Sequence, residues 1–149
     1  MEQEIIKIRK KVKKELDKER FEHTKGVAYT AGCLAMAHGC DVNQAIIAGL
    51  LHDCAKCIPN EKKLQLCRKH HISLTRVEER NPFLIHAKLG AFLAREKYQV
   101  MDPAICHAIE GHTTGAPHMN TLDKILFIAD YIEPNRDKAP NLGRVRAEA

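Results

Sequence analysis

Apolar residues recur three or four positions apart along most of the chain, and this spacing constrains the fold more than any other feature. The stripes lie within residues 5–16, 27–34, 42–50, 89–93, 105–109 and 122–129. Residues at this spacing share one face of an α-helix, whereas strands need alternating apolar runs, which the chain lacks. We therefore expect an all-α protein, a string of helices with short connections.

Helix-start and helix-stop residues divide the stripes. Gly39 predicts the end of the second helix. Asp41, followed three residues later by Gln44, predicts an N-cap with a capping box. Asp102 before Pro103 predicts a further helix start. Asn60 is expected to cap a helix over 61–70, Pro82 to precede the next, Thr121 to open a later one and Pro134 to stop it.

Length and composition predict a single domain over residues 1–149. The chain of 149 residues, 44% hydrophobic and 29% charged, is long enough for one soluble domain with its own core. Residues 145–149 read as the start of a helix without a stop signal. We therefore expect a truncated domain whose C-terminal helices are missing from this chain.

No apolar run approaches the length of a membrane span, and the first 20 residues lack the apolar core of a secretory signal. A cytoplasmic protein with free thiols is expected. The formal net charge is +5, much of it within residues 7–20. A basic segment suits a polyanionic partner, but interspersed acidic residues favour a solvated helix face. Exposed aromatic residues for stacking are not expected, so neither is a stable nucleic-acid complex.

Ionisable residues continue several apolar stripes at the same spacing: His23, Asp53, His86, His112 and Asp130. Burying a carboxylate costs several kcal/mol unless it is paired or bound to a metal. A divalent cation would satisfy this set, and His52 lies next to Asp53. Periodicity alone leaves hydrogen-bonded core histidines as an equal alternative, because His38 shows the same spacing.

Two cysteines compete for the role of metal ligand. Cys54 and Cys57 form a C-x-x-C, which is typical of half a structural zinc site or of a redox pair. No second pair exists among the six cysteines, and no strand precedes the motif. Buried apolar cysteines are the favoured interpretation. No glycine-rich phosphate loop is present, but "HTTG" at 112–115 suits contact with a phosphate as well as a plain turn.

A His, then His-Asp, then two His and a distant Asp, in this order, resemble the HD-domain metal-dependent phosphohydrolases. The flanking segments "RFEHTKGV", "GLLHDCAKCIP", "NPFLIHAKLGAFL", "EGHTTGAPHM" and "ILFIADYIEPNRD" closely resemble the bacterial YqeK-type branch. Members of that branch are symmetrical bis(5′-nucleosyl)-tetraphosphatases, which split diadenosine tetraphosphate into two ADP. The resemblance runs from about residue 4 to the end; "DKAPNLGRVR" departs from the Phe-Pro-Gly-type turn usual there.

The resemblance implies an HD-domain helical bundle and hydrolysis by metal-activated water. It implies a metal, typically iron, at His23, His52, Asp53 and Asp130, with a second metal or the phosphates at His86 and His112. Manganese and zinc also suit such a donor set. Catalytic roles are expected at Asp53, Lys56, His86 and His112. Nucleotide contacts are expected at Arg20, Asp53, Lys56, His86, His112, Thr113, Asp130 and Arg136.

The substrate implied is a dinucleoside polyphosphate, and the family often forms homodimers. Three alternatives remain. The same HD site could act on a nucleoside mono- or triphosphate or on an alarmone. The chain could be a non-enzymatic basic helical module that binds RNA or a partner, with structural histidines. Cys54 and Cys57 could have a zinc or redox role.

Overall fold

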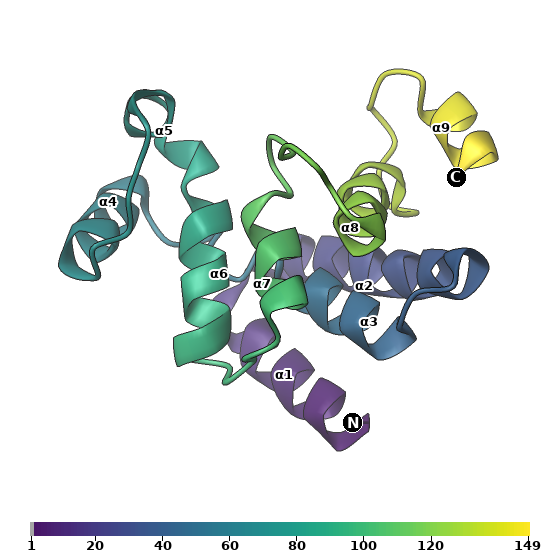
Figure 1. Ribbon diagram of the computed structural model, residues 1–149, viewed down its shortest axis with the longest axis horizontal. Helices are drawn as coiled ribbons and strands as arrows, with labels where there is room; N and C mark the ends of the chain where they lie inside the picture. The colour runs from purple at the N-terminus through teal and green to yellow at the C-terminus, as the bar shows by residue number, and fades with distance from the viewer. Residues whose placement is uncertain (1) are drawn as a thin grey trace.

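The computed structural model describes residues 2–149, which form nine α-helices and one short 3₁₀-helix and contain no strand (Figure 1). The all-α prediction is therefore confirmed. The elements are α1 Glu2–Glu15, α2 Lys18–His38, α3 Val42–Leu51, α4 Asn60–Lys69, α5 Arg76–Arg80, η1 Pro82–Leu84, α6 His86–Glu96, α7 Pro103–Glu110, α8 Thr121–Ile132 and α9 Leu142–Glu148. None of these helices has the length and apolar character needed to cross a bilayer.

The stop at Gly39 and the cap at Asp41 lie where the sequence predicts them, with one correction. Gly39 closes α2 with a φ of 71°, and the Asp41 carboxylate accepts from the Gln44 backbone N–H at 3.0 Å. The predicted capping box is wrong in its second half. The Gln44 side chain donates instead to Asp102 Oδ2 at 2.7 Å, which connects the start of α3 to the start of α7.

The sequence analysis did not predict α5, a helix of five residues. Thr75 and Glu78 form a complete capping box around its start, in which each side chain bonds the other residue's backbone N–H. The pattern S/T-x-x-E was present to be found, but the segment lacks an apolar stripe. The fourth helix begins at Asn60 itself, after Pro59, and α9 begins at Leu142 rather than near Val145.

The main core lies between α2 and α3, which pack most extensively on each other, with α1, α7 and α8 around them. Small residues permit this close packing. A Cβ added at Gly49 in α3 would lie 2.6 Å from the Cα of Ala28 in α2, a distance that a side chain does not tolerate. The helix pair α2–α3 therefore holds two segments of the chain in fixed register.

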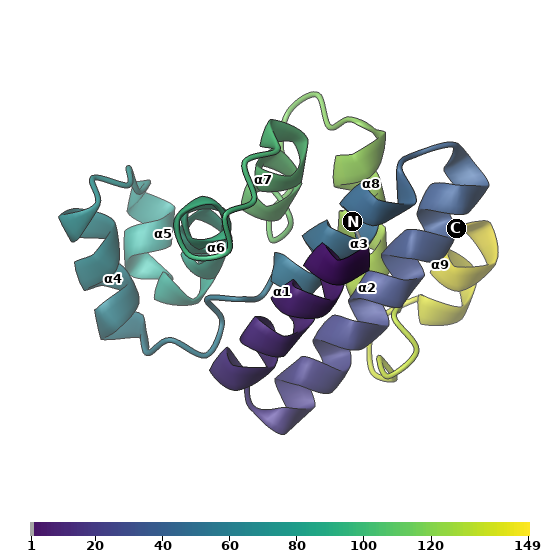
Figure 2. The same cartoon turned by 90° about the horizontal axis from the view of Figure 1, so that it is seen from below.

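A smaller lobe, residues 60–84, lies to one side of this core and contains α4, α5 and η1 (Figures 1 and 2). An apolar cluster around Cys67, Ile85 and Leu89 packs this lobe against α6. The Lys88 ammonium of α6 fastens it by donating to Ser73 O and Glu78 Oε2, both at 2.9 Å. The end of α3, the start of α6 and the ends of α7 and α8 thus meet where the lobe joins the core.

Candidate metal centre

Six side chains predicted from the sequence converge at this junction: His23, His52, Asp53, His86, His112 and Asp130. They come from the first half of α2, the end of α3, the start of α6, the residue after the cap of α7 and the last turns of α8. Four of them are buried to 97% or more, while His23 and Asp130 are partly exposed. Segments more than 100 residues apart in the chain therefore share one buried polar centre.

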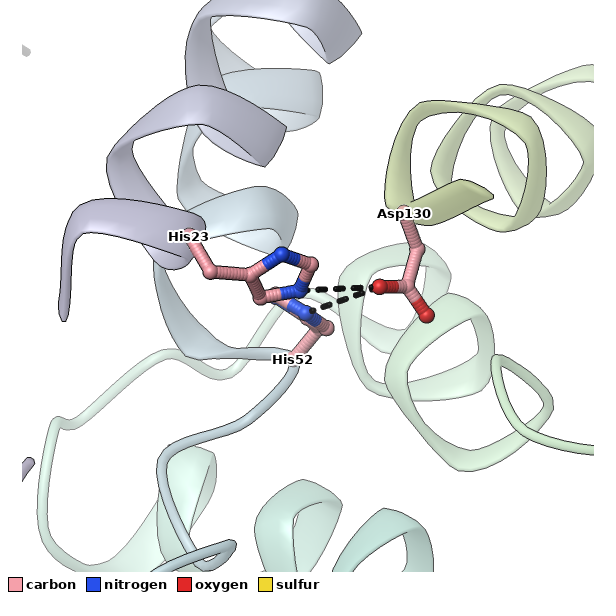
Figure 3. Close-up of side chains that lie close together, drawn as sticks. All are labelled: His23, His52 and Asp130. Atoms are coloured by element: carbon pink, nitrogen blue, oxygen red, sulfur yellow. Dashed lines mark hydrogen bonds and ion pairs between the residues drawn. The ribbon is translucent and has the colours of Figure 1, made fainter. Parts of the chain in front are cut away.

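Three nitrogen and oxygen atoms on one side of the cluster come from His23, His52 and Asp130, whose side chains point toward one another (Figure 3). Asp130 Oδ1 lies 3.0 Å from His23 Nε2 and 3.6 Å from His52 Nε2. Asp53 Oδ2 joins this group at 3.3 Å from His52 Nε2 and 3.7 Å from His23 Nε2. Two imidazoles and two carboxylates thus surround one point.

The other oxygen of Asp53 faces a second group. Asp53 Oδ1 lies 3.2 Å from His86 Nε2 and 3.4 Å from His112 Nε2. The two imidazole Nε2 atoms are only 3.2 Å from each other. One carboxylate therefore bridges the two halves of the cluster, an arrangement that accommodates either one cation or two neighbouring cations.

Backbone carbonyls fix the tautomers of three histidines. The Nδ1 atoms of His52, His86 and His112 lie 2.6, 2.6 and 2.7 Å from the carbonyl oxygens of Gly49, Phe83 and Ile109. A carbonyl only accepts, so Nδ1 carries a proton, and each ring, when neutral, presents its Nε2 lone pair to the centre.

The donor set fits a divalent cation. Within residues 2–149, the buried His52 Nε2 atom has the oxygens of Asp53 and Asp130 nearby but forms no hydrogen bond. The two lone pairs of His86 and His112 repel each other at 3.2 Å unless a cation or a proton lies between them. Imidazole nitrogens and carboxylate oxygens are the ligands that iron, manganese and zinc share.

The titration of the cluster is consistent with this donor set. Burial alone would raise the pKa of the Asp53 and Asp130 carboxyls, but hydrogen bonds and the charge of surrounding histidines hold both well below the ordinary value. Burial lowers the pKa of His86 and favours its neutral form. For His52, burial also lowers the pKa, but the two aspartates outweigh it and raise the value to about 10. A metal entering the cluster must therefore displace a proton.

Positively charged and hydroxyl side chains predicted to contact phosphate lie along a cavity of about 350 Å³ that opens onto the cluster. Arg20 Nη1 donates to Asp53 Oδ2 at 3.0 Å, and Arg136 Nη2 to the Asp130 carbonyl at 2.9 Å. Lys56 and Thr113 line the same cavity. α3 ends at Leu51, and a turn in which the Lys56 N–H donates to the Asp53 carbonyl at 2.9 Å places Lys56 at the cavity.

Aromatic side chains at this cavity correct one expectation. Phe83 and Phe127 line it and are 54% and 38% exposed, so exposed aromatic residues are present after all. Each precedes a cluster residue by three positions, Phe83 before His86 and Phe127 before Asp130. Their exposure is not visible in the sequence, because phenylalanine at such a position normally predicts core packing.

The cysteines lie outside the clusters of possible metal ligands found among residues 2–149. Cys54 is buried with its thiol toward the Gly90 carbonyl, and burial together with the Asp53 charge raises its pKa to about 12. Without a metal it is therefore a neutral thiol. Cys57 is exposed and faces Asp17 at 3.6 Å. His38, which shares the sequence spacing, lies elsewhere with Nε2 at 3.0 Å from the Ala149 carbonyl.

Comparison with known proteins places this geometry in a family. The model of the HD domain matches residues 20–135. The symmetrical bis(5′-nucleosyl)-tetraphosphatase of Bacillus subtilis is 41% identical over 135 residues, which cover 91% of this chain and 72% of that protein. The protein of the same name from Halalkalibacterium halodurans is 38% identical over 93% of this chain and 73% of its own length.

A solved structure agrees. An HD superfamily hydrolase of Clostridium acetobutylicum, described as involved in NAD metabolism, superimposes with a TM-score of 0.90 at 40% identity, covering 95% of this chain and 74% of that one. The chain therefore belongs to the HD-domain family of divalent-metal-dependent hydrolases and, within it, to the family of the symmetrical bis(5′-nucleosyl)-tetraphosphatases.

Proposed function

We propose that the protein hydrolyses diadenosine tetraphosphate symmetrically into two ADP. The observation that carries this proposal is the buried His/Asp cluster at the base of a cavity whose walls hold Arg20, Lys56 and Arg136. Such a cavity offers metal ligands beside cations, the combination that hydrolysis of a phosphoric anhydride requires. The names of the relatives specify the substrate and the symmetrical cleavage.

We assign the metal to His23, His52, Asp53 and Asp130, and a second metal, where one binds, to His86 and His112 with the bridging Asp53. Iron is the metal that we propose, with manganese and zinc compatible with the same donors. When bound, a divalent metal lowers the pKa of water toward neutrality and polarises a phosphoryl oxygen.

The chain's own residues bind and orient the polyphosphate. Arg136 uses Nη2 on Asp130, and its side chain, which is 38% exposed, keeps its other guanidinium donors for a phosphate oxygen. Arg20 uses one guanidinium nitrogen on Asp53 and keeps its remaining donors. Lys56 adds a third positive charge, and Thr113 a hydroxyl donor. These groups hold the phosphates in line for attack and stabilise charge that spreads over their oxygens.

Proton transfer is assigned to the buried side of the cavity. Asp53 accepts the proton of the attacking water, because both oxygens of its carboxylate face the centre of the cluster. His86 or His112 returns a proton to the departing phosphate when a second metal does not occupy their Nε2 atoms.

Two cavities that meet at Arg20 and Arg136 offer space for the two halves of the dinucleotide. A second cavity, of about 690 Å³, shares Arg20 and Arg136 with the first and extends over Lys18, Asn135 and Lys138. We place one half of the dinucleotide in each cavity, with Phe83 and Phe127 offering a face on which one base stacks.

A product assay tests the proposal. Purified protein is incubated with diadenosine tetraphosphate, and the nucleotides are separated by chromatography with metal analysis of the same sample. We expect ADP as the sole product. AMP together with ATP would contradict symmetrical cleavage, and faster hydrolysis of a nucleoside triphosphate or an alarmone would support the alternative substrate.

A further inference from the structure

Glu133 is a buried carboxylate behind His23 to which the sequence assigns no role. It follows the last residue of α8, and 2% of its surface is exposed. Its Oε1 lies 3.2 Å from His23 Nδ1, the ring nitrogen that faces away from the cluster. On the other edge of the same ring, Nε2 faces Asp130. We infer that Glu133 is a positioning residue, which orients His23 for the metal and raises the basicity of its Nε2.

Both carboxylate oxygens of Glu133 already have partners outside the cluster centre, so Glu133 is not itself a metal ligand. Oε2 accepts from the Asn135 backbone N–H at 3.0 Å while Oε1 faces His23. Because the His23 ring lies between Glu133 and the cluster centre, the carboxylate acts through the imidazole. Carboxylates in this place fix the tautomer and rotation of a ligating histidine and increase its affinity for the metal.

The backbone that carries Glu133 is held in place from α9. The Arg146 guanidinium donates to the carbonyl oxygens of Ile132, Glu133 and Arg136 at 3.0, 2.9 and 2.8 Å. One side chain therefore fixes the turn that contains both Glu133 and the phosphate-facing Arg136. A carboxylate on such a turn has little freedom to leave His23.

Gly26 makes the space that Glu133 needs. It lies one helical turn after His23 on α2, and a Cβ added there would lie 2.2 Å from Glu133 Oε2. Any larger residue would displace the carboxylate from its bonds to His23 and Asn135. The glycine is explained by this contact, and it offers a second way to disturb the pair without changing either member.

This inference rests on the metal site of the proposed function, and the test separates the two. The metal-free protein is titrated with Mn²⁺ in a calorimeter, and its unfolding temperature is measured without metal. For Glu133→Gln and for Gly26→Ala we expect the dissociation constant to rise by about 10- to 100-fold, the loss usual when a partner of a ligating histidine is removed. At saturating Mn²⁺ the KM for nucleotide should stay unchanged.

Asp123→Asn is the matched control, because Asp123 is similarly buried and its carboxylate also contacts a histidine and a backbone N–H, but in the first turn of α8, away from the possible metal ligands. It should lower the unfolding temperature without changing Mn²⁺ affinity. Affinity within twofold of the wild type in both Glu133→Gln and Gly26→Ala would overturn the inference. A wild-type protein that binds no Mn²⁺ or Fe²⁺ would instead overturn the metal site itself.

Discussion

His52 and Asp53 are neighbours in the chain, yet their side chains reach the same point, with His52 Nε2 3.3 Å from Asp53 Oδ2. Neighbours on a regular helix diverge by about 100°, so this convergence requires the helix to end between them. The last residue of α3 is Leu51, and His52 is the cap residue whose Nδ1 donates to the Gly49 carbonyl. Asp53 begins the following turn and is free to aim at both halves of the cluster.

The bridging position of Asp53 makes its charge the most sensitive element of the site. Asp53→Asn keeps the shape of the side chain but removes the charge that contacts four histidines and Arg20. We expect the metal content of the purified protein to fall and kcat/KM to drop by about 1,000-fold, equivalent to about 4 kcal/mol. Asp41→Asn, at the cap of α3, is the control and should retain both. Full metal content in Asp53→Asn would remove this residue from the ligand set.

The two cysteines next to the His-Asp pair provide the complementary prediction. Cys54→Ala and Cys57→Ser, made separately and together, should leave the metal-to-protein ratio unchanged in elemental analysis. Cys54 is buried, so its truncation should cost about 1 kcal/mol of unfolding free energy. If the double variant lost the metal while its fold stayed intact by circular dichroism, the two thiols would have to be metal ligands.

The cluster could be predicted because periodicity and burial coincide there. His86, His112 and Asp130 each continue an apolar stripe, so the helix geometry that buries Leu89, Ile109 and Leu126 carries them inward as well. The helix caps at Asp41 and Asp102 could be predicted for a similar reason, since they are local features of the sequence. Each depends on residues within three positions of one another.

Glu133 was not found in this way: it lies four positions after Ala129, but directly before Pro134, where the helix is expected to stop. Its partner His23 is 110 positions earlier in the chain, and its space is made by Gly26 on another helix. The exposure of Phe83 and Phe127 depends likewise on how η1 and α8 face the cavity. Contacts between elements distant in the chain determine these positions, and such contacts cannot be predicted from the local pattern of one sequence.

Lys56 tests the phosphate side of the cavity separately from the metal. Lys56→Met keeps most of the apolar stem and removes the charge that lines the cavity. We expect kcat/KM for diadenosine tetraphosphate to fall by about 10-fold, or about 1.4 kcal/mol, with metal content unchanged. Lys62→Met, on the exposed face of α4, is the control and should fall by less than about twofold. Equal effects of the two substitutions would exclude a specific phosphate contact at Lys56.

His107 and Asp123 provide a pH-dependent link between α7 and α8. The hydrogen bond and charge of Asp123, at 3.0 Å, raise the pKa of His107 above its ordinary value. Because the folded-state pKa exceeds the unfolded value of about 6.5, the stabilisation is fully present below that pH and disappears as pH rises through the folded-state pKa. The imidazole is 53% exposed, so solvent screening limits the effect to about 0.2–1 kcal/mol.

The difference in unfolding temperature between the wild type and His107→Gln measures this link, because all other titrating groups are common to both proteins. We expect the wild type to unfold about 1–3 °C higher at pH 5.5, and the difference to shrink toward zero by pH 9. Scanning fluorimetry in buffers of equal ionic strength measures both values. A difference that is constant across this range, or that grows with pH, would mean that His107 stabilises the protein in its neutral form and that its charge has no part in joining α7 to α8.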